Sequence, residues 1–450
     1  MSDPNTSPDT FSKTHGKQLY ISFMVYMFDV LSYISVSFVV PYMAKEIYPS
    51  VNIGISLLVT WGGFAAGAVF RPFGAAIFSK MVDVTSRKKS ISINLTLSSV
   101  LTAAIALVPT YSQVGVFSPI IFIVLRLAGG VFIGALISGG LALGPENFPE
   151  KLRGFLTGVT ESGAHWAHAV GAAWFLLTTL IVVGSMYTSY GWRFMFLLFL
   201  IPLAAVLPIL HYTPESSIQV MAKRTNNTEK SPLRSLLSKK GNIRNAFILA
   251  VFMAIGLNGY TSNTDNVFPT FLKEVNHMLP SSLATIVLIG GFLGVIGAML
   301  GGALSQKIGR RNLAIIVGFL ILVSSYLFIP LGNTSGKSFY TILILTAPMY
   351  FFPTMLLADF AVILNETFRT ANRGTAIGVA WNLGYATAAV WPLVISAIIA
   401  IRGIGVYASA QFVLVAVLAA LFIVATFLSK ESKGNISVER QEMIEEEKTL

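Results

Sequence analysis

Ionisable side chains inside long apolar stretches are the residues of this sequence that could do chemistry. Asp29 lies within the first such stretch and Arg126 within the fourth. A charge at bilayer depth costs at least several kcal/mol unless it is paired or hydrated, so both residues are functional candidates. Burial raises the pKa of a carboxyl group and a nearby guanidinium lowers it, so an arginine that moves could switch the proton affinity of an aspartate. The alternative is a permanent ion pair that only orients helices.

A second group of titratable residues lies in the fifth apolar stretch. Glu161, His165 and His168 are spaced i, i+4 and i+7, which predicts that they share one face of a helix. Histidine titrates near neutrality, so this group could relay a proton or hydrogen-bond an anionic solute. Equally, both histidines could be neutral residues that hydrogen-bond within a helix bundle. A zinc site built from these three side chains would instead suggest an intramembrane transferase.

Composition indicates what kind of element positions these residues. The 450-residue chain is 54% hydrophobic and 11% charged, and its mean hydropathy is +0.72, whereas about a quarter of the residues in a soluble domain are charged. The net charge of +11 does not indicate nucleic-acid binding, because the bases lie in short segments between apolar runs. The absence of cysteine excludes a disulfide, a thiol nucleophile and a cysteine metal site. We therefore expect an all-α integral membrane protein.

Apolar runs long enough to cross a hydrocarbon core of ~30 Å recur along the chain. The predicted spans are twelve, at 19–44, 55–79, 90–110, 117–143, 154–183, 192–212, 243–271, 282–305, 312–331, 338–364, 374–400 and 404–428. One long polar interruption separates six spans from six. The expected domains are an N-terminal tail (1–18), a six-helix bundle (19–212), a linker (213–242), a second six-helix bundle (243–428) and a C-terminal tail (429–450).

The basic residues predict the orientation of these spans. Lys and Arg concentrate in alternate loops and in the segment Lys223 to Arg244, and Arg71 is counted among them. Because such bases favour the cytoplasmic side and the number of spans is even, both termini are expected to be cytoplasmic. The expected location is the plasma membrane.

Two loop motifs are repeated between the predicted halves. The motif at 83–88 recurs at 306–311, an offset of 223 residues, and the motif at 146–154 recurs at 366–374, an offset of 220 residues. Nearly equal offsets indicate one duplicated six-helix unit. Acid and base pairs near helix ends could latch helices in one state and release them in another. The residues assigned to gating are Asp83, Arg87, Glu146, Arg153, Arg310, Asp359, Glu366 and Arg373.

These motifs, with Gly191-Trp192-Arg193 before the sixth span, resemble the major facilitator superfamily over essentially the whole chain. Within it, similarity to the metabolite:proton symporters, a group for carboxylates and zwitterions, rests on Phe70-Arg71-Pro72-Phe73-Gly74, Phe268-Pro269-Thr270-Phe271-Leu272, and Asn382-Leu383-Gly384 with Pro392. The sugar porters are the second resemblance, through Glu146, Arg153-Gly154 and Pro214-Glu215-Ser216. The chain lacks their glutamine-rich seventh-helix motif, and the superfamily pattern is altered at Ser79, Val82, Ser86 and Gln306.

The resemblance implies two pseudo-symmetric six-helix bundles that work by alternating access, with protons as the coupling ion and without a cofactor or metal. It places Asp29 as the proton acceptor, with Arg126 as its arginine partner. Glu161, His165 and His168 are further coupling candidates from their spacing on one helical face. Solute contacts are expected from Arg126, Asn258, Tyr260, Asn263, Trp381, Asn382 and Tyr385. The run from Asn258 to Asp265 is polar enough to predict a water-exposed, unwound stretch.

The resulting prediction is a secondary active transporter, not an enzyme, that carries a carboxylate or zwitterionic metabolite together with protons. A sugar:proton symporter is the alternative. A drug exporter is less favoured, because the fifth-span glycines are dispersed without the antiporter motif. No Walker sequence is present in the right context, which argues against ATP-driven transport. The expected partners are a small solute and lipid, with no nucleic acid, and the expected state is a monomer.

Overall fold

The computed structural model describes residues 11–48, 53–84, 87–182, 186, 189–211, 232–238, 242–332, 338–436, 439 and 442. Over these residues the regular structure is helical, with no strand. Twelve helical segments among them are long and apolar enough to cross a membrane, judged by length and composition. The predicted all-α fold with twelve spans is therefore confirmed. The predicted linker lies largely outside the described residues, apart from α12 (Pro232–Leu236).

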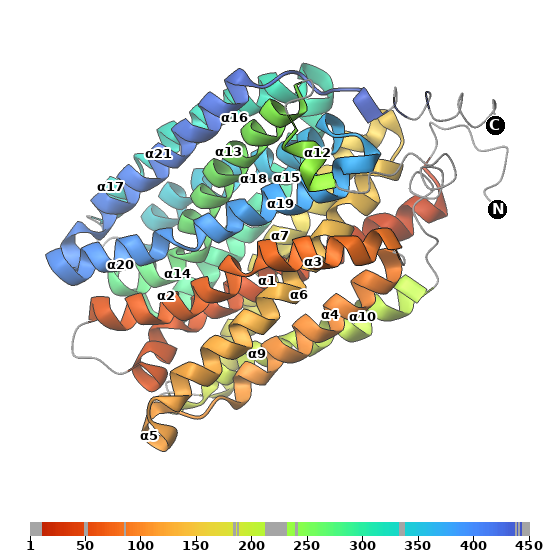
Figure 1. Ribbon diagram of the computed structural model, residues 1–450. Coiled ribbons are helices and arrows are strands. Elements are labelled where there is room, and N and C mark those ends of the chain that lie inside the picture. Colours follow the sequence, from red (N-terminus) through yellow and green to blue (C-terminus); the bar gives the residue numbers. More distant parts are fainter. Residues whose placement is uncertain are drawn as a thin grey trace.

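Figure 1 shows the long helices packed side by side along one common direction. The N-terminal half consists of α1 (Lys13–Ile47), α2 (Ile53–Val69), α3 (Arg71–Val84), α4 (Arg87–Ala104), η1 (Ile105–Leu107), α5 (Tyr111–Val114), α6 (Phe117–Asn147), α7 (Glu150–Ile181), η2 (Gly191–Arg193), α9 (Phe194–Leu197), η3 (Leu198–Leu200) and α10 (Ile201–His211). The C-terminal half consists of α13 (Ile243–Thr261), η4 (Ser262–Asn266), α14 (Phe268–Glu274), α15 (Pro280–Ile308), α16 (Arg310–Ser325), α17 (Phe328–Gly332), α18 (Phe339–Thr367), α19 (Thr370–Ala388), α20 (Trp391–Arg402), η5 (Ile404–Val406) and α21 (Tyr407–Leu428).

Three of the twelve spans are broken where a proline begins a new helix. Pro72 follows the break between α2 and α3, Pro269 lies in the first turn of α14, and Pro392 lies in the first turn of α20. Proline has no backbone N–H to donate, so it interrupts a helix but fits its first turn. All three prolines belong to the segments that resemble the metabolite:proton symporters. The breaks between α2 and α3 and between α19 and α20 lie in helices that pack against each other across the two halves.

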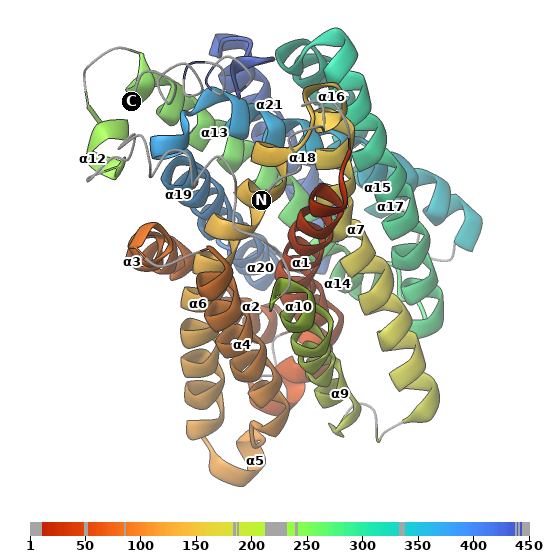
Figure 2. The ribbon, with the colours of Figure 1, turned by 90° about the vertical axis from the view of Figure 1, so that its right-hand side faces the viewer.

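The two halves pack along α7 and α15, which lie beside each other in Figure 2. Glycines allow this close approach: a Cβ atom at Gly158 would lie 2.6 Å from the carbonyl oxygen of Ala298. The two halves also touch on the other side of the molecule, where α19 contacts α3 and α6. Small residues at a helix interface bring backbones together, which is the usual means of helix association in a membrane.

The two ends of the bundle differ in chemistry. The first turns of α1 and the last turns of α21 lie at one end, which we call the terminal end (Figure 1). At the opposite end the halves meet through Lys273 of α14, whose ammonium lies 3.9 Å from the ring centre of Tyr42 on α1. The terminal end instead carries several ion pairs between arginine and glutamate.

Candidate functional site

A buried ion pair joins α1 to α3 inside the membrane-spanning region. The guanidinium of Arg71 is paired with the carboxylate of Asp29, and both residues are 1% exposed. Arg71 is the first residue of α3, so the break before Pro72 determines where its side chain points. The same guanidinium lies 5.0 Å from the ring centre of Tyr385 on α19, within the range of a cation–π contact. The pair therefore belongs to the N-terminal half and also contacts the C-terminal half.

The expected pairing of Asp29 with Arg126 is corrected by this arrangement. Arg126 donates a hydrogen bond to the carbonyl oxygen of Ser32 at 3.4 Å, and its guanidinium lies 5.0 Å from the ring centre of Phe64. Ser32 follows Asp29 by one helical turn. Arg126 on α6 therefore contacts α1 about one turn beyond Asp29. The arginine that pairs with Asp29 is Arg71, which the basic-residue count had placed in a cytoplasmic loop.

Aromatic side chains from both halves lie beside the Asp29–Arg71 pair. The ring of Tyr26 on α1 meets Trp381 of α19 edge to face, with ring centres 5.9 Å apart. Tyr26 is also an electrostatic neighbour of Asp29, Glu161 and Tyr385. We call these six residues the central cluster: Tyr26, Asp29, Arg71, Glu161, Trp381 and Tyr385. Four come from the N-terminal half and two from the C-terminal half.

Several members of the central cluster carry buried polar atoms without a hydrogen-bond partner among the described residues: Tyr26 Oη, Asp29 Oδ2, Trp381 Nε1 and both carboxyl oxygens of Glu161. Glu161 is 1% exposed, and the hydroxyl of Tyr26 is the neighbouring group able to donate to its carboxyl oxygens. Its electrostatic neighbours include Tyr26 and Asp29. Since buried polar atoms are nearly always paired, such atoms require an explanation.

The structure separates the two histidines of α7 from Glu161. His165 lies against Gly294 of α15. Its ring stacks on His168 with centres 5.2 Å apart, and His168 meets Tyr350 of α18 at 6.3 Å. The described residues contain no group of three side chains able to hold a metal ion, so the zinc site considered for this face is not formed. Glu161, His165 and His168 are spaced along α7 as predicted, but they face different helices. Glu161 has neighbours on α1, whereas the two histidines contact α15 and α18.

Asn382 of α19 joins the two halves, whereas its neighbour Trp381 also packs within the C-terminal half. The side-chain amide of Asn382 donates to the carbonyl oxygen of Gly134 on α6 at 3.2 Å and to that of Gly378 at 2.7 Å. Trp381 stacks on Phe360 of α18 at 5.6 Å. Of the three residues predicted on this helix, Trp381 and Tyr385 belong to the central cluster, whereas Asn382 contacts backbone.

The polar run of the seventh span is buried and not exposed to water as predicted. Asn258 and Asn263 are almost fully buried, and Ser262–Asn266 forms a π-helical turn and not an unwound stretch. The side-chain Nδ2 of Asn263 donates to the carbonyl oxygen of Gly259 at 2.7 Å, so the backbone satisfies its amide N–H locally. The hydroxyl of Tyr260 lies 3.4 Å from that of Ser324 on α16, inside the C-terminal half. Tyr260 thus contacts a neighbouring helix of its own half, and its predicted solute role stays a prediction.

The side chains of Asp265, Asp83 and Arg87 lie outside the part of the structure that can be described. The water-exposed position predicted for Asp265 and the gating role predicted for Asp83 and Arg87 therefore stay predictions.

Two ion pairs at the terminal end cross between the halves. Arg153 of α7 lies 3.6 Å from Glu366 of α18, and Arg373 of α19 lies 3.7 Å from Glu146 of α6. The two pairs are related by the internal repeat. Both arginines also donate to a backbone carbonyl five residues earlier, Arg153 to Phe148 at 3.4 Å and Arg373 to Phe368 at 3.0 Å.

A third arginine completes this gate cluster within the C-terminal half. Arg310 binds Glu366 through two hydrogen bonds, of 3.1 and 3.2 Å, and also donates to Gln306 at 2.7 Å. Asp359 is buried and has Arg310 and Ser305 as electrostatic neighbours. All the gating residues whose side chains are described, namely Glu146, Arg153, Arg310, Asp359, Glu366 and Arg373, thus lie in one region of the terminal end.

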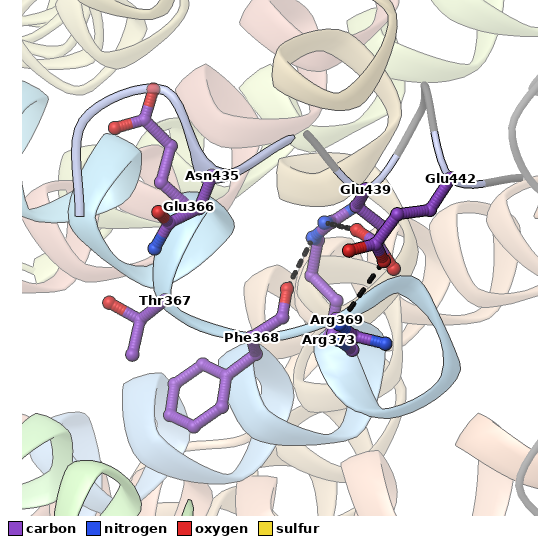
Figure 3. Close-up of a pocket in the computed structure, with 8 residues that line it drawn as sticks. All are labelled: Glu366, Thr367, Phe368, Arg369, Arg373, Asn435, Glu439 and Glu442. Atoms are coloured by element: carbon purple, nitrogen blue, oxygen red, sulfur yellow. Dashed lines mark hydrogen bonds and ion pairs between the residues drawn. The ribbon is translucent and has the colours of Figure 1, made fainter. Parts of the chain in front are cut away.

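The segment after α21 adds contacts that sequence reasoning missed. Glu439 pairs with Arg373 at 2.5 Å and accepts a hydrogen bond from the backbone N–H of Thr370 at 2.6 Å (Figure 3). Glu431 accepts hydrogen bonds from the backbone N–H groups of Arg310 and Arg311, at the start of α16. A carboxylate at a helix start binds the free N–H groups there and the positive end of the helix dipole. Nothing in the tail's polar composition predicted where these acids would bind.

Glu439 also borders a cavity of about 270 Å³ at the terminal end. Figure 3 shows Glu439 on Arg373 and the more exposed Glu442 on Arg369, the latter pair 3.1 Å apart.

Comparison with known proteins gives a consistent result. The sequence model of the Major Facilitator Superfamily matches residues 22–392. A citrate-proton symporter of Klebsiella pneumoniae is 26% identical over 290 residues, 64% of each chain. A proline/betaine transporter of Escherichia coli is 24% identical over 369 residues, 79% of this chain and 72% of that one. The xylose transporter XylE of E. coli, in a partially occluded inward open conformation, superimposes with a TM-score of 0.71 at 17% identity, over 94% of this chain and 99% of that chain.

Proposed function

Since this chain belongs to the Major Facilitator Superfamily, we propose that it carries a small organic solute bearing a carboxylate across the membrane together with protons. The observation that carries the proposal is the buried pair of Asp29 and Arg71 in contact with both halves. A titratable carboxylate and a guanidinium at this depth are costly to bury and mark the route of an ion or solute.

The pair couples proton and solute through a shared counterion. While Asp29 is ionised it neutralises Arg71, so an incoming anion finds no unbalanced positive charge. When Asp29 accepts a proton, it no longer neutralises the charge of Arg71, and a solute carboxylate can take the place of Asp29. Proton and anion therefore raise each other's affinity, which is the thermodynamic requirement for symport.

The ion pairs of the terminal end serve as the gate in this proposal. Glu146–Arg373 and Glu366–Arg153 each join the halves, so they must break before that end can open. Breaking them releases the halves to rock about the central cluster, as alternating access requires. The basic loops favour a cytoplasmic position for this end, in a plasma membrane.

The names of the relatives support a carboxylate as the solute. Citrate, proline and betaine all carry one, and the relatives named for them match most of the present chain. A sugar remains the second candidate because the fold matches that of the xylose transporter. A sugar is uncharged, however, and gives Arg71 no counterion when Asp29 is protonated.

Uptake by purified protein in proteoliposomes tests the proposal. We expect an inward proton gradient to stimulate accumulation of citrate or betaine, and a protonophore to abolish it, while xylose is not accumulated. Asp29→Asn should lower gradient-driven uptake at least about tenfold yet retain solute exchange, since exchange needs no net proton movement. Glu150→Gln, which removes an exposed carboxylate at the start of α7, is the matched control. Gradient-driven uptake that is unchanged in Asp29→Asn would contradict the role of Asp29.

A further inference from the structure

Asp29 also borders a small cavity within the N-terminal half. The cavity lies where α1, α4 and α6 meet, beside η3, and its volume is about 10 Å³. A space of about 10–15 Å³ is the smallest that holds one water molecule. Part of the wall is apolar, with Phe28, Ile133 and Phe199 among its residues. The polar side chains that line the cavity are Asp29, Ser32, Ser98, Ser99 and Thr102.

Two of the lining hydroxyl groups already use their hydrogen atoms on the backbone. The hydroxyl of Ser32 donates to the carbonyl oxygen of Asp29 at 2.6 Å, and that of Ser98 donates to the carbonyl oxygen of Leu95 at 3.1 Å. A hydroxyl has one hydrogen and two lone pairs, so these oxygen atoms can only accept from a molecule in the cavity. That molecule must therefore bring hydrogen atoms to donate.

The carboxyl group of Asp29 offers a further acceptor. Its Oδ1 pairs with the guanidinium of Arg71, whereas Oδ2 has no hydrogen-bond partner among the described residues, although Asp29 is 1% exposed. Buried polar atoms of this kind are commonly bound by ordered water. A water molecule in the cavity can donate to Oδ2 and to a serine oxygen, and it can accept from the hydroxyl of Ser99 or Thr102.

The charges beside the cavity favour a neutral molecule over a metal cation. Arg71 lies on Asp29, and Arg126 donates to the carbonyl oxygen of Ser32 at 3.4 Å. Among the described residues that line the cavity, Asp29 is the one titratable group. A sodium ion would thus meet two guanidinium groups and a single carboxylate, and the repulsion between like charges is strong where water is scarce. A water molecule carries no such cost.

We infer that this cavity is the site of a single water molecule through which Asp29 exchanges its proton. The inference rests on the proposed function, which makes Asp29 the proton acceptor. The proton arrives as a hydronium ion, one of whose O–H bonds breaks as the bond between that hydrogen and Oδ2 forms, and neutral water remains. The positive charge is transient because the carboxylate takes it up at once. Proton and solute therefore use different groups, the proton Oδ2 of Asp29 and the solute carboxylate Arg71.

An experimental structure at a resolution that shows ordered water tests the site directly. We expect one water molecule within hydrogen-bond distance, about 2.5–3.0 Å, of Asp29 Oδ2 and of a hydroxyl oxygen on α4. A dry cavity, a metal cation in this position, or Oδ2 bound to another protein group would overturn the inference.

Thr102→Val tests the role of the water molecule in transport, because it removes a hydroxyl at nearly constant volume. We expect gradient-driven uptake in proteoliposomes to fall about tenfold, and its solvent isotope effect to increase as proton transfer becomes the slow step. Thr102→Ser keeps the hydroxyl and should keep both values. Thr96→Val is the matched control on α4, since its hydroxyl donates to the carbonyl oxygen of Ser92 at 2.9 Å, outside the cavity.

The isotope effect separates proton transfer from a general loss of structure. A misfolded variant would lose uptake and solute exchange together without a larger isotope effect, and that result for Thr102→Val would contradict the inference. Unchanged uptake with an unchanged isotope effect would contradict it as well.

The inference and the proposed function fail in different measurements. Wild-type protein without proton-driven uptake would contradict the proposed function, whatever the cavity holds. Proton-driven uptake by a protein whose cavity is dry would contradict the water site alone. Uptake driven by a sodium gradient in place of a proton gradient would contradict both.

Discussion

At the scale of single residues, the Asp29–Arg71 pair shows why a buried ion pair is a poor source of stability and a good switch. Removing two charges from water costs about as much as their attraction returns, so the intact pair contributes little. Loss of Arg71 leaves Asp29 buried without its cation. The same imbalance that destabilises a variant is what the transport cycle uses when Asp29 is protonated.

A double-mutant cycle on this pair tests the contact itself. We expect Arg71→Gln to lower the free energy of unfolding by about 3–5 kcal/mol, because it leaves Asp29 buried without its cation. Asp29→Asn combined with Arg71→Gln should recover most of that loss, since two neutral side chains can hydrogen-bond to each other. Unfolding of the purified variants in detergent provides the measurement. Arg126→Gln is the comparison, and recovery of its loss by Asp29→Asn to the same extent would show that Arg126 is the true partner.

At the scale of elements, the breaks in the helices decide which residues of the site could be predicted from the sequence. The twelve spans and the gate cluster were predictable, because apolar run length and the repeated motifs are local signals. Asp29 and Glu161 were predictable as charges inside apolar runs. Arg71 was not, because it was counted among the cytoplasmic bases although it lies within the span predicted at 55–79, and only the break before Pro72 turns it inward. The contact of Tyr260 with α16 was not predictable, because the sequence does not show which neighbouring helix a polar side chain faces.

The break between α2 and α3 gives a prediction of its own. Pro72→Ala restores a backbone N–H and favours a continuous helix, which rotates Arg71 away from Asp29. We expect gradient-driven uptake to fall several-fold, with the Michaelis constant for the solute raised. Pro208→Ala in α10 removes another intrahelical proline without affecting Arg71 and should behave like the wild type. Wild-type uptake in Pro72→Ala would show that the break does not position the arginine.

The segment after α21 is a further element with a testable role. Glu439 binds the same guanidinium of Arg373 that faces Glu146, and it also caps the start of α19. Glu439→Gln should therefore loosen the terminal end and increase the fraction of molecules in which it is open. Spin labels at Lys151→Cys and Lys307→Cys, at exposed sites on α7 and α15, report the distance between the halves. Glu442→Gln, on a solvent-exposed pair, should leave the distance distribution unchanged.

At the scale of the whole molecule, the internal repeat relates the ion pairs at the terminal end of the two halves. It does not relate the residues of the central cluster. Glu146 and Arg153 of one half correspond to Glu366 and Arg373 of the other, and each acid pairs with the arginine of the opposite half. The charged groups of the central cluster all belong to the N-terminal half, while the C-terminal half contributes Trp381 and Tyr385. Proton binding in one half is thus able to alter a contact that both halves share.

This architecture predicts that locking the terminal end stops transport without removing the binding site. The native chain contains no cysteine, so Lys151→Cys with Lys307→Cys introduces the only thiols. A short bifunctional crosslinker between them holds α7 to α15, and since the terminal end must separate in every cycle, we expect uptake to be lost. Solute binding measured in detergent should persist, and a crosslinker cleavable by reductant should allow uptake to recover. Each single cysteine variant treated with the same reagent is the control. Continued uptake by the fully crosslinked protein would exclude a cycle in which the halves separate at this end.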